Sequence, residues 1–357
     1  MDLKKHLAIA DKLVGNSPVI PIIENMLLTK GKAEITNLEA DFSFPIDGDI
    51  VEPMLIGFSK FYRIAKSLKF DFTLKFKEDG ISLESKKGEF FIEKSELDIE
   101  DFPSVENALD VSSKDVFMKT QRIDKFRADS IRQCLPFLSK DDLRPAITGV
   151  FVGERHIVAT NAHIMKFIEC ENTVQTIIPP SIASLIEERA DLNQYFIGKS
   201  SQSVCEVEFD DKSRLVYTPI DSKYPQYESV IPENNPFCLR VDKKQFIETV
   251  DSCIMYFDKK EQLKTGGKFP IKIAVIEGQI KVQTNPDKDV SPNAIDFTSL
   301  LMGRVESGDM NAFGFDAEKL IVALKSIQDN ELVFVGSKPS RAFVINGDTL
   351  VMPVMIK

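Results

Sequence analysis

Three stretches of this chain share one pattern of apolar and polar positions. The segments "TKGKAEITN", "GERHIVATN" and "EGQIKVQTN" end at Asn37, Asn161 and Asn285, so successive copies are 124 residues apart. In each copy an apolar run leads through a short turn with a glycine into an alternation of apolar and polar residues. That succession predicts a β-hairpin. The apolar runs and glycines are 26–28 with Gly31, 150–152 with Gly153, and 273–276 with Gly278.

Two amphipathic helices are expected around each hairpin, because apolar residues recur there at steps of three and four. Aspartates suited to cap a helix N-terminus precede three of them, namely Asp124, Asp242 and Asp316. Pro179 and Pro180 suit the first turn of another. The six expected helices are 2–14, 55–69, 124–140, 179–192, 242–260 and 316–327.

Further alternating strands close each third of the chain, so the order helix, hairpin, helix and strands occurs three times. This order predicts an α+β fold of three similar domains, at 1–118, 119–236 and 237–357. The polar stretches 107–122 and 232–237 are the expected seams. The alternative is a simple duplication that carries no special geometry. The expected strands include 70–76, 80–85, 205–210, 331–336 and 341–346.

Charge is unevenly distributed along the chain. The net charge of −10 by itself argues against nucleic acid as a partner. The six expected helices nevertheless carry a net charge of +6, and the helix at 55–69 has four basic residues and no acid. If the helices share one surface, that surface suits a polyanion held by non-specific phosphate contacts. The alternative is that lysine and arginine are simply common on solvated helix faces.

The sequence argues against several classes of protein. No apolar run approaches the roughly 18 residues that a membrane span needs, and the N-terminus has no signal-peptide core. The five cysteines are scattered without metal-ligand spacing, as expected for reduced thiols in a cytosolic protein. The sequence has no H-E-x-x-H, P-loop, G-x-G-x-x-G or G-x-S-x-G motif. We therefore expect no catalytic site, no metal and no cofactor.

Four motifs, in their order along the chain, resemble one known family. They are "LRPAITGVFV" (143–152), "IVATNAHIMKF" (157–167), "KYPQYESVIP" (223–232) and "LVMPV" (350–354). Three further stretches stand in the family's order: "IPIIENMLL" (20–28), "DFP" (101–103) and "FGFDAEKLIVALKSI" (313–327). Over essentially its whole length, the chain resembles the bacterial DNA polymerase III β subunit family, the sliding clamps.

The resemblance implies a ring without enzymatic activity. In this family two protomers form a head-to-tail homodimer, in which six similar domains and twelve inward-facing helices enclose duplex DNA. Enclosure without sequence-specific contacts permits sliding and gives processivity. The implied partners are double-stranded DNA, the DNA polymerase III α subunit, clamp-loader peptides and a second copy of the chain. No membrane partner is implied, and the implied location is cytoplasmic and nucleoid-associated. The alternative is a clamp-like paralogue that keeps the ring but serves other partners.

The resemblance also implies an apolar pocket for short peptides, between the second and third domains. Such a pocket accepts Leu, Met or Phe anchors from several partners. Single residues have other interpretations: His163 as a structural histidine, Pro225 as a turn residue, and Pro353 as the edge of a buried terminal strand. The implied lining residues are Ile147, Thr160, Ala162, His163, Ile164, Met165, Pro225, Val230, Leu350, Met352, Pro353 and Val354.

The chain departs from the family's pattern at several functional positions. The family usually has Asp-Gly-His-Arg where this chain has Asn-Ala-His-Ile at 161–164. Glu228 and Ser229 replace residues that are commonly basic, and Ser17 stands where a DNA-contacting arginine is common. These departures bear on peptide specificity and on the strength of DNA contact. The residues expected to face DNA are Lys60, Arg63, Lys66, Lys69, Lys125, Arg127 and Arg132.

Overall fold

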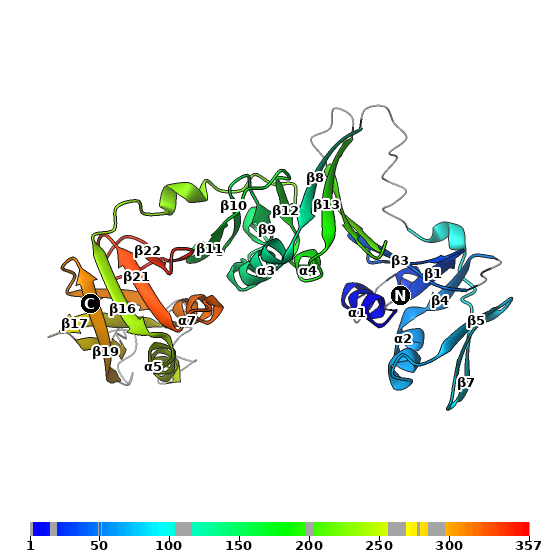
Figure 1. Ribbon diagram of the computed structural model, residues 1–357, viewed down its shortest axis with the longest axis horizontal. Coiled ribbons are helices and arrows are strands. Elements are labelled where there is room, and N and C mark those ends of the chain that lie inside the picture. Colours follow the sequence, from blue (N-terminus) through cyan, green and yellow to red (C-terminus); the bar gives the residue numbers. More distant parts are fainter. Residues whose placement is uncertain are drawn as a thin grey trace. The chain divides into compact units, whose positions relative to one another are not determined.

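The computed structural model describes residues 3–14, 20–48, 50, 52–103, 116–197, 203–255, 269–276, 279–284 and 297–356. It divides into two compact units, each built of antiparallel strands and helices (Figure 1). Unit 1 comprises 1–129 and 172–221, and unit 2 comprises 130–171 and 222–357. The chain passes from unit 1 to unit 2 within α3 (Lys125–Cys134). The α+β class expected from the sequence is confirmed.

Unit 1 contains an eight-stranded sheet and a separate three-stranded sheet. Its elements are α1 (Leu3–Val14), η1 (Pro21–Glu24), β1 (Asn25–Thr29), β2 (Lys32–Thr36), β3 (Ala40–Pro45), β4 (Met54–Gly57), α2 (Phe58–Ser67), β5 (Thr73–Lys77), β6 (Gly80–Ser85), β7 (Gly88–Glu93), η2 (Ile99–Asp101), β8 (Val116–Ile123), β12 (Thr176–Ile178), α4 (Pro180–Ala183), β13 (Ala190–Ile197), β14 (Ser203–Phe209) and β15 (Arg214–Tyr217). The larger sheet has the order β4-β1-β2-β3-β15-β14-β13-β8, and the smaller one β5-β6-β7.

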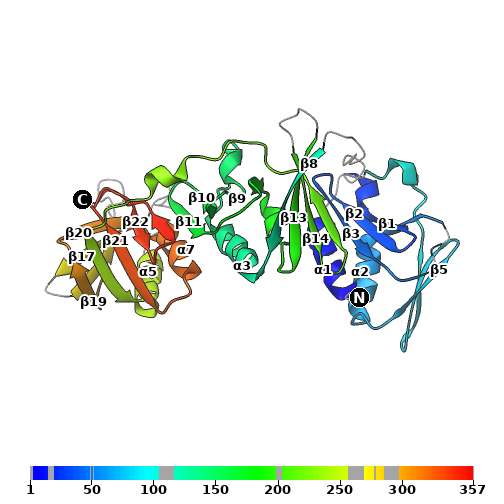
Figure 2. The ribbon, with the colours of Figure 1, turned by 45° about the horizontal axis from the view of Figure 1, so that its top comes forward.

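The core of unit 1 lies between α1, α2 and the first strands of the larger sheet (Figure 2). Leu7 and Ala10 of α1 are fully buried, because a spacing of three places them on one helix face. Phe61 of α2 is also fully buried, as is Phe42 of β3. Burying a side chain of this size stabilises the fold by about 2 kcal/mol.

Unit 2 contains one continuous run of strands with helices packed on it. Its elements are η4 (Leu135–Phe137), η5 (Pro145–Ile147), β9 (Val150–Val152), β10 (His156–Thr160), β11 (Ile164–Glu169), η6 (Tyr227–Val230), β16 (Phe237–Asp242), α5 (Lys243–Met255), β17 (Pro270–Ile276), β18 (Gln279–Thr284), β19 (Thr298–Ser307), β20 (Ala312–Asp316), α7 (Ala317–Ser326), β21 (Glu331–Gly336), β22 (Phe343–Ile345) and β23 (Thr349–Val351). The strand order is β9-β10-β11-β23-β22-β21-β16-β19-β18-β17-β20.

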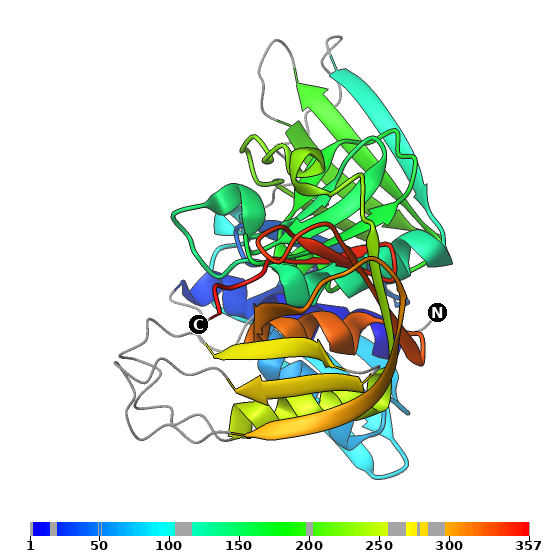
Figure 3. The ribbon, with the colours of Figure 1, turned by 90° about the vertical axis from the view of Figure 1, so that its left-hand side faces the viewer.

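Phenylalanines fill the core beneath strands β16, β20 and β22 of unit 2. Phe313 and Phe343 stack with ring centroids 4.6 Å apart, and Phe237 meets Phe313 edge to face at 5.8 Å. Helices α5 and α7 pack against each other and against strands of this region, as Figure 3 shows. Phe246 of α5 is fully buried, so this helix is held by its apolar face.

All three expected hairpins are present. The pairs β1·β2, β9·β10 and β17·β18 are antiparallel, and Gly31 turns the first with a φ of 75°. Gly278 and Asn285 of the third copy lie outside the described residues. The three expected helix caps are confirmed as well, because Asp124, Asp242 and Asp316 each accept a backbone N–H from the first helical turn.

The repeated Thr-Asn pair forms a turn after the second strand of the hairpin. Thr36 Oγ1 accepts a hydrogen bond from the backbone N of Leu38 at 3.1 Å, and Asn37 Oδ1 accepts one from Ala40 N at 2.8 Å. Leu38 has a φ of 76°, a conformation that costs a residue other than glycine about 1 kcal/mol. The two side-chain acceptors offset that cost by bonding the turn's own backbone.

The same turn recurs in the second copy. Thr160 Oγ1 accepts from Ala162 N at 3.1 Å, and Asn161 Oδ1 accepts from Ile164 N at 3.0 Å. Ala162 has a φ of 71°, close to that of Leu38. The Thr-Asn pair of the repeat therefore stabilises the backbone of a turn. This turn sets the direction of the residues that follow it.

One expected helix is wrong. The segment 179–192 was expected to be helical, but α4 spans only Pro180–Ala183. Arg189 has a φ of 66°, which reverses the chain, and β13 begins at Ala190. Ala190 and Leu192 are fully buried between β8 and β14. Strand pairing with distant segments therefore outweighs the local helical preference.

Three other boundaries shift for local reasons. The helix expected at 124–140 ends at Cys134, and Leu135–Phe137, which contains a proline, forms the separate short helix η4. The helix expected at 55–69 starts at Phe58, because 54–57 pair with β1 as β4. The strand expected at 70–76 starts at Thr73, because Lys69 and Phe70 have φ values of 55° and 61°. A turn thus separates α2 from β5.

The seam expected at 107–122 is partly wrong. Residues 116–123 form β8, the edge strand of the larger sheet in unit 1, and the expected domain boundary after 118 falls inside it. The polar composition that suggested a linker reflects the exposed position of an edge strand. Residues 107–115 lie outside the described residues. The division into three domains otherwise stays a prediction.

The strand that follows each of the first two hairpins pairs with a strand from much later in the chain. In unit 1, β3 pairs with β15, and Ala40 lies opposite Tyr217. In unit 2, β11 pairs with β23, and Ile164 lies opposite Val351. Ala40 and Ile164 are 124 residues apart, the spacing of the repeat. We call these pairings the first and the second junction.

The second junction buries an ion pair. Lys166 of β11 is 1% exposed, and its Nζ lies 2.7 Å from Asp348 Oδ1 and 3.1 Å from Thr349 Oγ1. At the equivalent position of the first junction, 124 residues earlier, Phe42 is fully buried. Removing an ammonium group from water costs several kcal/mol, so Lys166 depends on its partners.

Helix α1 is tied to the turn between β14 and β15. His6 is fully buried beside Phe44, and its Nε2 lies 3.0 Å from Asp211 Oδ2. Burial alone would raise the pKa of Asp211. Hydrogen bonds from the side chain and backbone of Ser213, and from His6, outweigh burial and lower this pKa to about 2.

The ion pair predicts an asymmetric response to substitution. Asp348→Ala leaves the Lys166 ammonium buried without its carboxylate, so we expect a loss of about 3 kcal/mol in unfolding free energy. Lys166→Met removes the buried charge and leaves Asp348, which is 36% exposed, to water, so we expect a loss of about 1 kcal/mol or less. Urea unfolding measures both. Lys212→Met, at an exposed pair with Glu208, serves as control. Equal losses in the two junction variants would contradict this account.

Asp211 predicts a pH dependence. A carboxyl whose pKa is lowered on folding stabilises the fold above its ordinary pKa of 3.8, and this contribution disappears as the pH falls toward 2. We expect Asp211→Asn to be less stable by about 1 kcal/mol near neutrality, after allowing for solvent screening of a side chain that is one-third exposed. The difference should shrink when urea unfolding is repeated from about pH 5 to about pH 3. Ser213→Ala, which removes one donor, should lessen the dependence. A difference that stays constant over this range would refute it.

Candidate functional site

The second junction brings two distant groups of predicted pocket residues together. Met165 of β11 lies opposite Leu350 of β23, and Thr160 of β10 lies opposite Met165. Beyond the end of β23, the backbone N of Met352 donates to the carbonyl of His163 at 2.8 Å. Residues 160–165 and 350–352 therefore form one continuous surface of unit 2.

These predicted residues divide into a buried base and an exposed rim. The rim is formed by the turn at 160–163, which leaves Ala162 and His163 exposed, and by Met352, which is 38% exposed. The ring of His163 makes no hydrogen bond to any described residue, so its interpretation as a satisfied structural histidine is not supported. The base residues, each at most 2% exposed, are Ile164, Met165 and Leu350, while the predicted residue Ile147 is buried in η5.

The segment after β23 lies against β20. The backbone N of Val354 donates to the carbonyl of Gly314 at 2.9 Å. A Cβ built on Gly314 would come within 2.1 Å of Ile356 Cγ2, so only glycine leaves room for the segment there. Pro353 and Val354 are half-buried, and Met355 is 88% exposed. The alternative interpretation of the terminal segment as a buried strand therefore applies to β23 only, and that strand ends at Val351.

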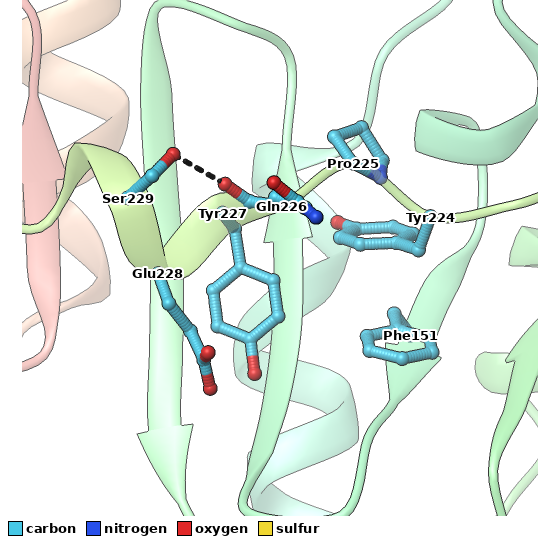
Figure 4. A pocket seen from close by; sticks show the side chains of 7 residues that line it. All are labelled: Phe151, Tyr224, Pro225, Gln226, Tyr227, Glu228 and Ser229. Atoms are coloured by element: carbon cyan, nitrogen blue, oxygen red, sulfur yellow. Dashed lines mark hydrogen bonds between the residues drawn. The ribbon is translucent and has the colours of Figure 1, made fainter.

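A cavity of about 400 Å³ lies on the same unit, beside β9. Phe151 of β9 and the six consecutive residues 224–229 line it (Figure 4). It contains the predicted residue Pro225, and Val230 follows directly at the end of η6. In the strand order β9-β10-β11, a single strand, β10, separates the strand that lines the cavity from the strand that carries Met165. Sequence reasoning did not assign the cavity.

Aromatic rings build the cavity wall. Phe151 and Tyr224 stack with centroids 4.5 Å apart and an interplanar angle of 10°, and Tyr227 meets both rings edge to face. The hydroxyl of Tyr227 lies 3.1 Å from Nδ1 of His156, which fixes the ring. Burial raises the pKa of Tyr227 to about 12. The sequence does not predict the contact between these three aromatic residues, because Phe151 is remote from the other two along the chain.

The predicted DNA-facing residues differ in their exposure and in whether described acidic residues bind them. Lys60, Arg63 and Lys66 are exposed on α2, and Lys69 is exposed in the turn that follows it. Within the described part of the chain, these four form no ion pair. Lys66 Nζ lies 5.8 Å from the centroid of the Tyr62 ring. Helix α2 therefore presents unneutralised positive charge.

The basic residues of α3 are more constrained. Lys125 and Arg132 are exposed. Arg127 is only 19% exposed at its side chain, and its guanidinium donates to Asp124 at 2.8 Å and to Asn172 at 3.3 Å. Asp124 is the helix cap as well, so Arg127 is committed to the start of α3. Of the two helices, α2 offers the stronger anion-binding surface.

Whether the described residues could bind a metal, cross a membrane or react through a cysteine also bears on function. No group of three or more His, Cys, Asp or Glu side chains among them is arranged to hold a metal ion. None of the described helices combines the length and the apolar character that crossing a membrane requires. All five cysteines are free thiols, and burial raises the pKa of Cys253 to about 12.

Comparison with known proteins gives a consistent result. No model of a protein family matches the chain. The beta sliding clamp of Pseudomonas aeruginosa is 22% identical, over 99% of this chain and 98% of that protein. The beta sliding clamp of Pseudomonas putida is also 22% identical, over 82% of this chain and 81% of that protein.

Solved structures share the fold along the whole chain. The DnaN sliding clamp of Pseudomonas aeruginosa, crystallised with griselimycin, matches with a TM-score of 0.77 and 20% identity, over 99% of this chain and 97% of that one. The DNA polymerase III beta subunit of Thermotoga maritima matches with a TM-score of 0.77 and 16% identity, over 100% and 98%. The resemblance read from the motifs is thus confirmed: the chain has the fold of the bacterial DNA polymerase III beta subunits, the sliding clamps, and resembles them along its whole length.

Proposed function

We propose that this chain is a DNA sliding clamp, a processivity factor without catalytic activity. Two copies join head to tail into a ring of six similar modules that encloses duplex DNA. Enclosure holds the ring on DNA, so affinity for any sequence is unnecessary. The observation that carries the proposal is the repetition of one strand junction within the chain.

The repetition supports ring closure because it leaves one junction open. The strand after the hairpin is β3 in the first module, β11 in the second and β19 in the third. The closing strand of the following module is β15 for β3 and β23 for β11. Among the described strands, β19 pairs with no closing strand of this kind, and β7, which closes the first module, pairs with no strand that follows a hairpin. A second copy supplies both partners.

The two open edges have the character of an interface. Strand β7 pairs only with β6, and residues 298–302 of β19 pair only with β18, among the described strands. Phe90 and Phe91 of β7 are 38% and 45% exposed, and Leu300 and Met302 of β19 are 59% and 72% exposed. Apolar side chains beside an unpaired strand edge favour pairing with another chain. We infer that β7 of one protomer pairs with β19 of the next.

The exposed cations of α2 suit the inside of such a ring. Lys60, Arg63, Lys66 and Lys69 form no ion pair with any described acidic residue, so they are available to phosphates without any base-specific contact. Phosphate contacts of this kind exchange rapidly and weaken with salt. They permit sliding, while the closed ring prevents escape.

The surface at the second junction suits a peptide of a replication partner. Its exposed rim at Ala162, His163 and Met352 surrounds a rigid apolar base, and Met352 is unbranched and adaptable. We infer that it tethers the DNA polymerase III α subunit and clamp-loader peptides through apolar anchors. A clamp-like paralogue with other partners is the second candidate, and Glu228, where relatives of this family commonly have a basic residue, favours it.

Enclosure predicts retention that depends on DNA topology. Protein assembled on nicked circular duplex should remain bound in about 0.5 M salt, where phosphate contacts are weak. Cutting the circle once should release it by sliding off the ends. Gel filtration of the complex before and after cutting measures both. A variant with Lys60, Arg63, Lys66 and Lys69 changed to glutamine should still be retained on the circle once assembled. Equal retention on circular and linear DNA would indicate ordinary DNA binding.

If the two open edges form the interface, the protein should be a dimer, and a charged side chain introduced at an edge should weaken that dimer. The protein should sediment as a dimer of 40.2-kDa chains at micromolar concentration. Leu300→Arg should raise the dissociation constant of the dimer at least about tenfold, because the buried guanidinium would lack a partner. Leu143→Arg, at a residue that is 91% exposed and away from either edge, serves as the matched control. A strictly monomeric unmodified protein, or an unaffected Leu300→Arg dimer, would contradict the proposed ring.

A further inference from the structure

We propose that the cavity beside β9 receives a cationic side chain, lysine or arginine, from the peptides that dock on this chain. The inference rests on the proposed function, because it concerns the partner of the same surface. Pro225 lies in the cavity and Val230 at its end, and both are among the residues expected to hold the peptide's apolar anchors. A bound peptide therefore passes close to the cavity mouth.

The walls of the cavity suit a cation. Tyr227 is half-exposed, and its ring is held edge-on to Phe151 and Tyr224 and anchored by His156 at 3.1 Å. The face of a tyrosine ring is electron-rich and attracts an ammonium or guanidinium group. Because Tyr227 is already fixed by its neighbours, a ligand does not bear the cost of ordering it.

The charge of the cavity points the same way. Glu228 is the charged residue among those that line it, and Figure 4 shows its side chain running alongside that of Tyr227. Glu228 is exposed and forms no ion pair with any described residue. Burial and Glu228 raise the pKa of Tyr227, and the nearby Arg155 lowers it by a smaller amount. Arg155 forms no ion pair with Glu228. The carboxylate is thus left for an external partner.

A second polar group in the cavity lacks a partner. Tyr224 is 8% exposed, and its buried hydroxyl makes no hydrogen bond in the described part of the chain. In Figure 4 the hydroxyl points toward Gln226, whose side chain is exposed. An unsatisfied buried hydroxyl is unfavourable, and it can accept a hydrogen bond from an N–H donor. A cationic side chain supplies such donors, whereas an acidic one would meet Glu228 and an apolar one would satisfy neither group.

The test uses the full-length dimer and a series of labelled nine-residue peptides. The parent peptide carries Leu and Phe anchors in an otherwise neutral sequence. A single lysine is moved through the flanking positions, and each lysine peptide is matched by a norleucine peptide of the same length. Fluorescence polarisation gives the dissociation constants. At one position at least, lysine should bind about three- to tenfold more tightly than norleucine, and the preference should fall with added salt.

Three variants assign the preference to the cavity. Glu228→Gln should reduce it to less than about twofold, and Glu228→Lys should reverse it in favour of a glutamate peptide. Glu233→Gln, five residues further along and outside the cavity, should leave it unchanged. No preference for lysine at any position, or a preference that survives Glu228→Gln, would overturn the inference.

The parent peptide separates this inference from the proposed function. If the parent binds, and deletion of 352–357 abolishes its binding while the dimer persists, the peptide surface stands whatever lysine does. If the parent binds and lysine adds nothing, only the cationic site is rejected. If neither peptide binds, or the deletion leaves affinity unchanged, the peptide surface itself is rejected, and the inference with it.

Discussion

The fold depends on one requirement of β-structure: each strand has two edges whose backbone N–H and C=O groups need partners. Strands β3 and β11 use one edge within their own hairpin region and find the other partner in β15 and β23. These two pairings turn a chain of similar modules into continuous sheets. They also place His163 beside Met352, so the candidate peptide surface exists only because the second junction is formed.

The two junctions occupy the same place in the repeat but differ in their chemistry. A slip of one residue would turn every side chain to the opposite face. Residues 40–44 of β3 and 164–168 of β11 are all buried, and the two strands differ in character at a residue that the repeat makes equivalent. At the first junction that residue is Phe42, whose ring lies beside those of His6 and Phe44. At the second it is Lys166, whose ammonium reaches Asp348 and Thr349. The pairing at the second junction tolerates a change of register less well, because a shifted strand would separate the buried ammonium group from its carboxylate. The junction that carries the candidate site thus has the more specific pairing.

Sequence reasoning succeeded where a few neighbouring residues decide the structure. The hairpins and the caps at Asp124, Asp242 and Asp316 depend on local turns and local hydrogen bonds, and they are confirmed. The helix expected at 179–192 is wrong because the partners of Ala190 and Leu192 lie in distant strands that the local pattern does not include. The candidate peptide residues followed from family resemblance. The cavity was missed because Phe151 meets Tyr224 only through the tertiary fold.

The order of the four junction strands along the chain is β3, β11, β15, β23, and the partners alternate, so the two pairings interleave. Partners lie about 180 residues apart, which makes both contacts strongly non-local and slow to form. Because the pairings interleave, the first module cannot be excised with its sheet intact. Its removal would separate β3 from its partner β15. The first two repeats therefore each need a strand from a later part of the chain to complete their sheets, although the repeats follow one another as separate segments along the sequence.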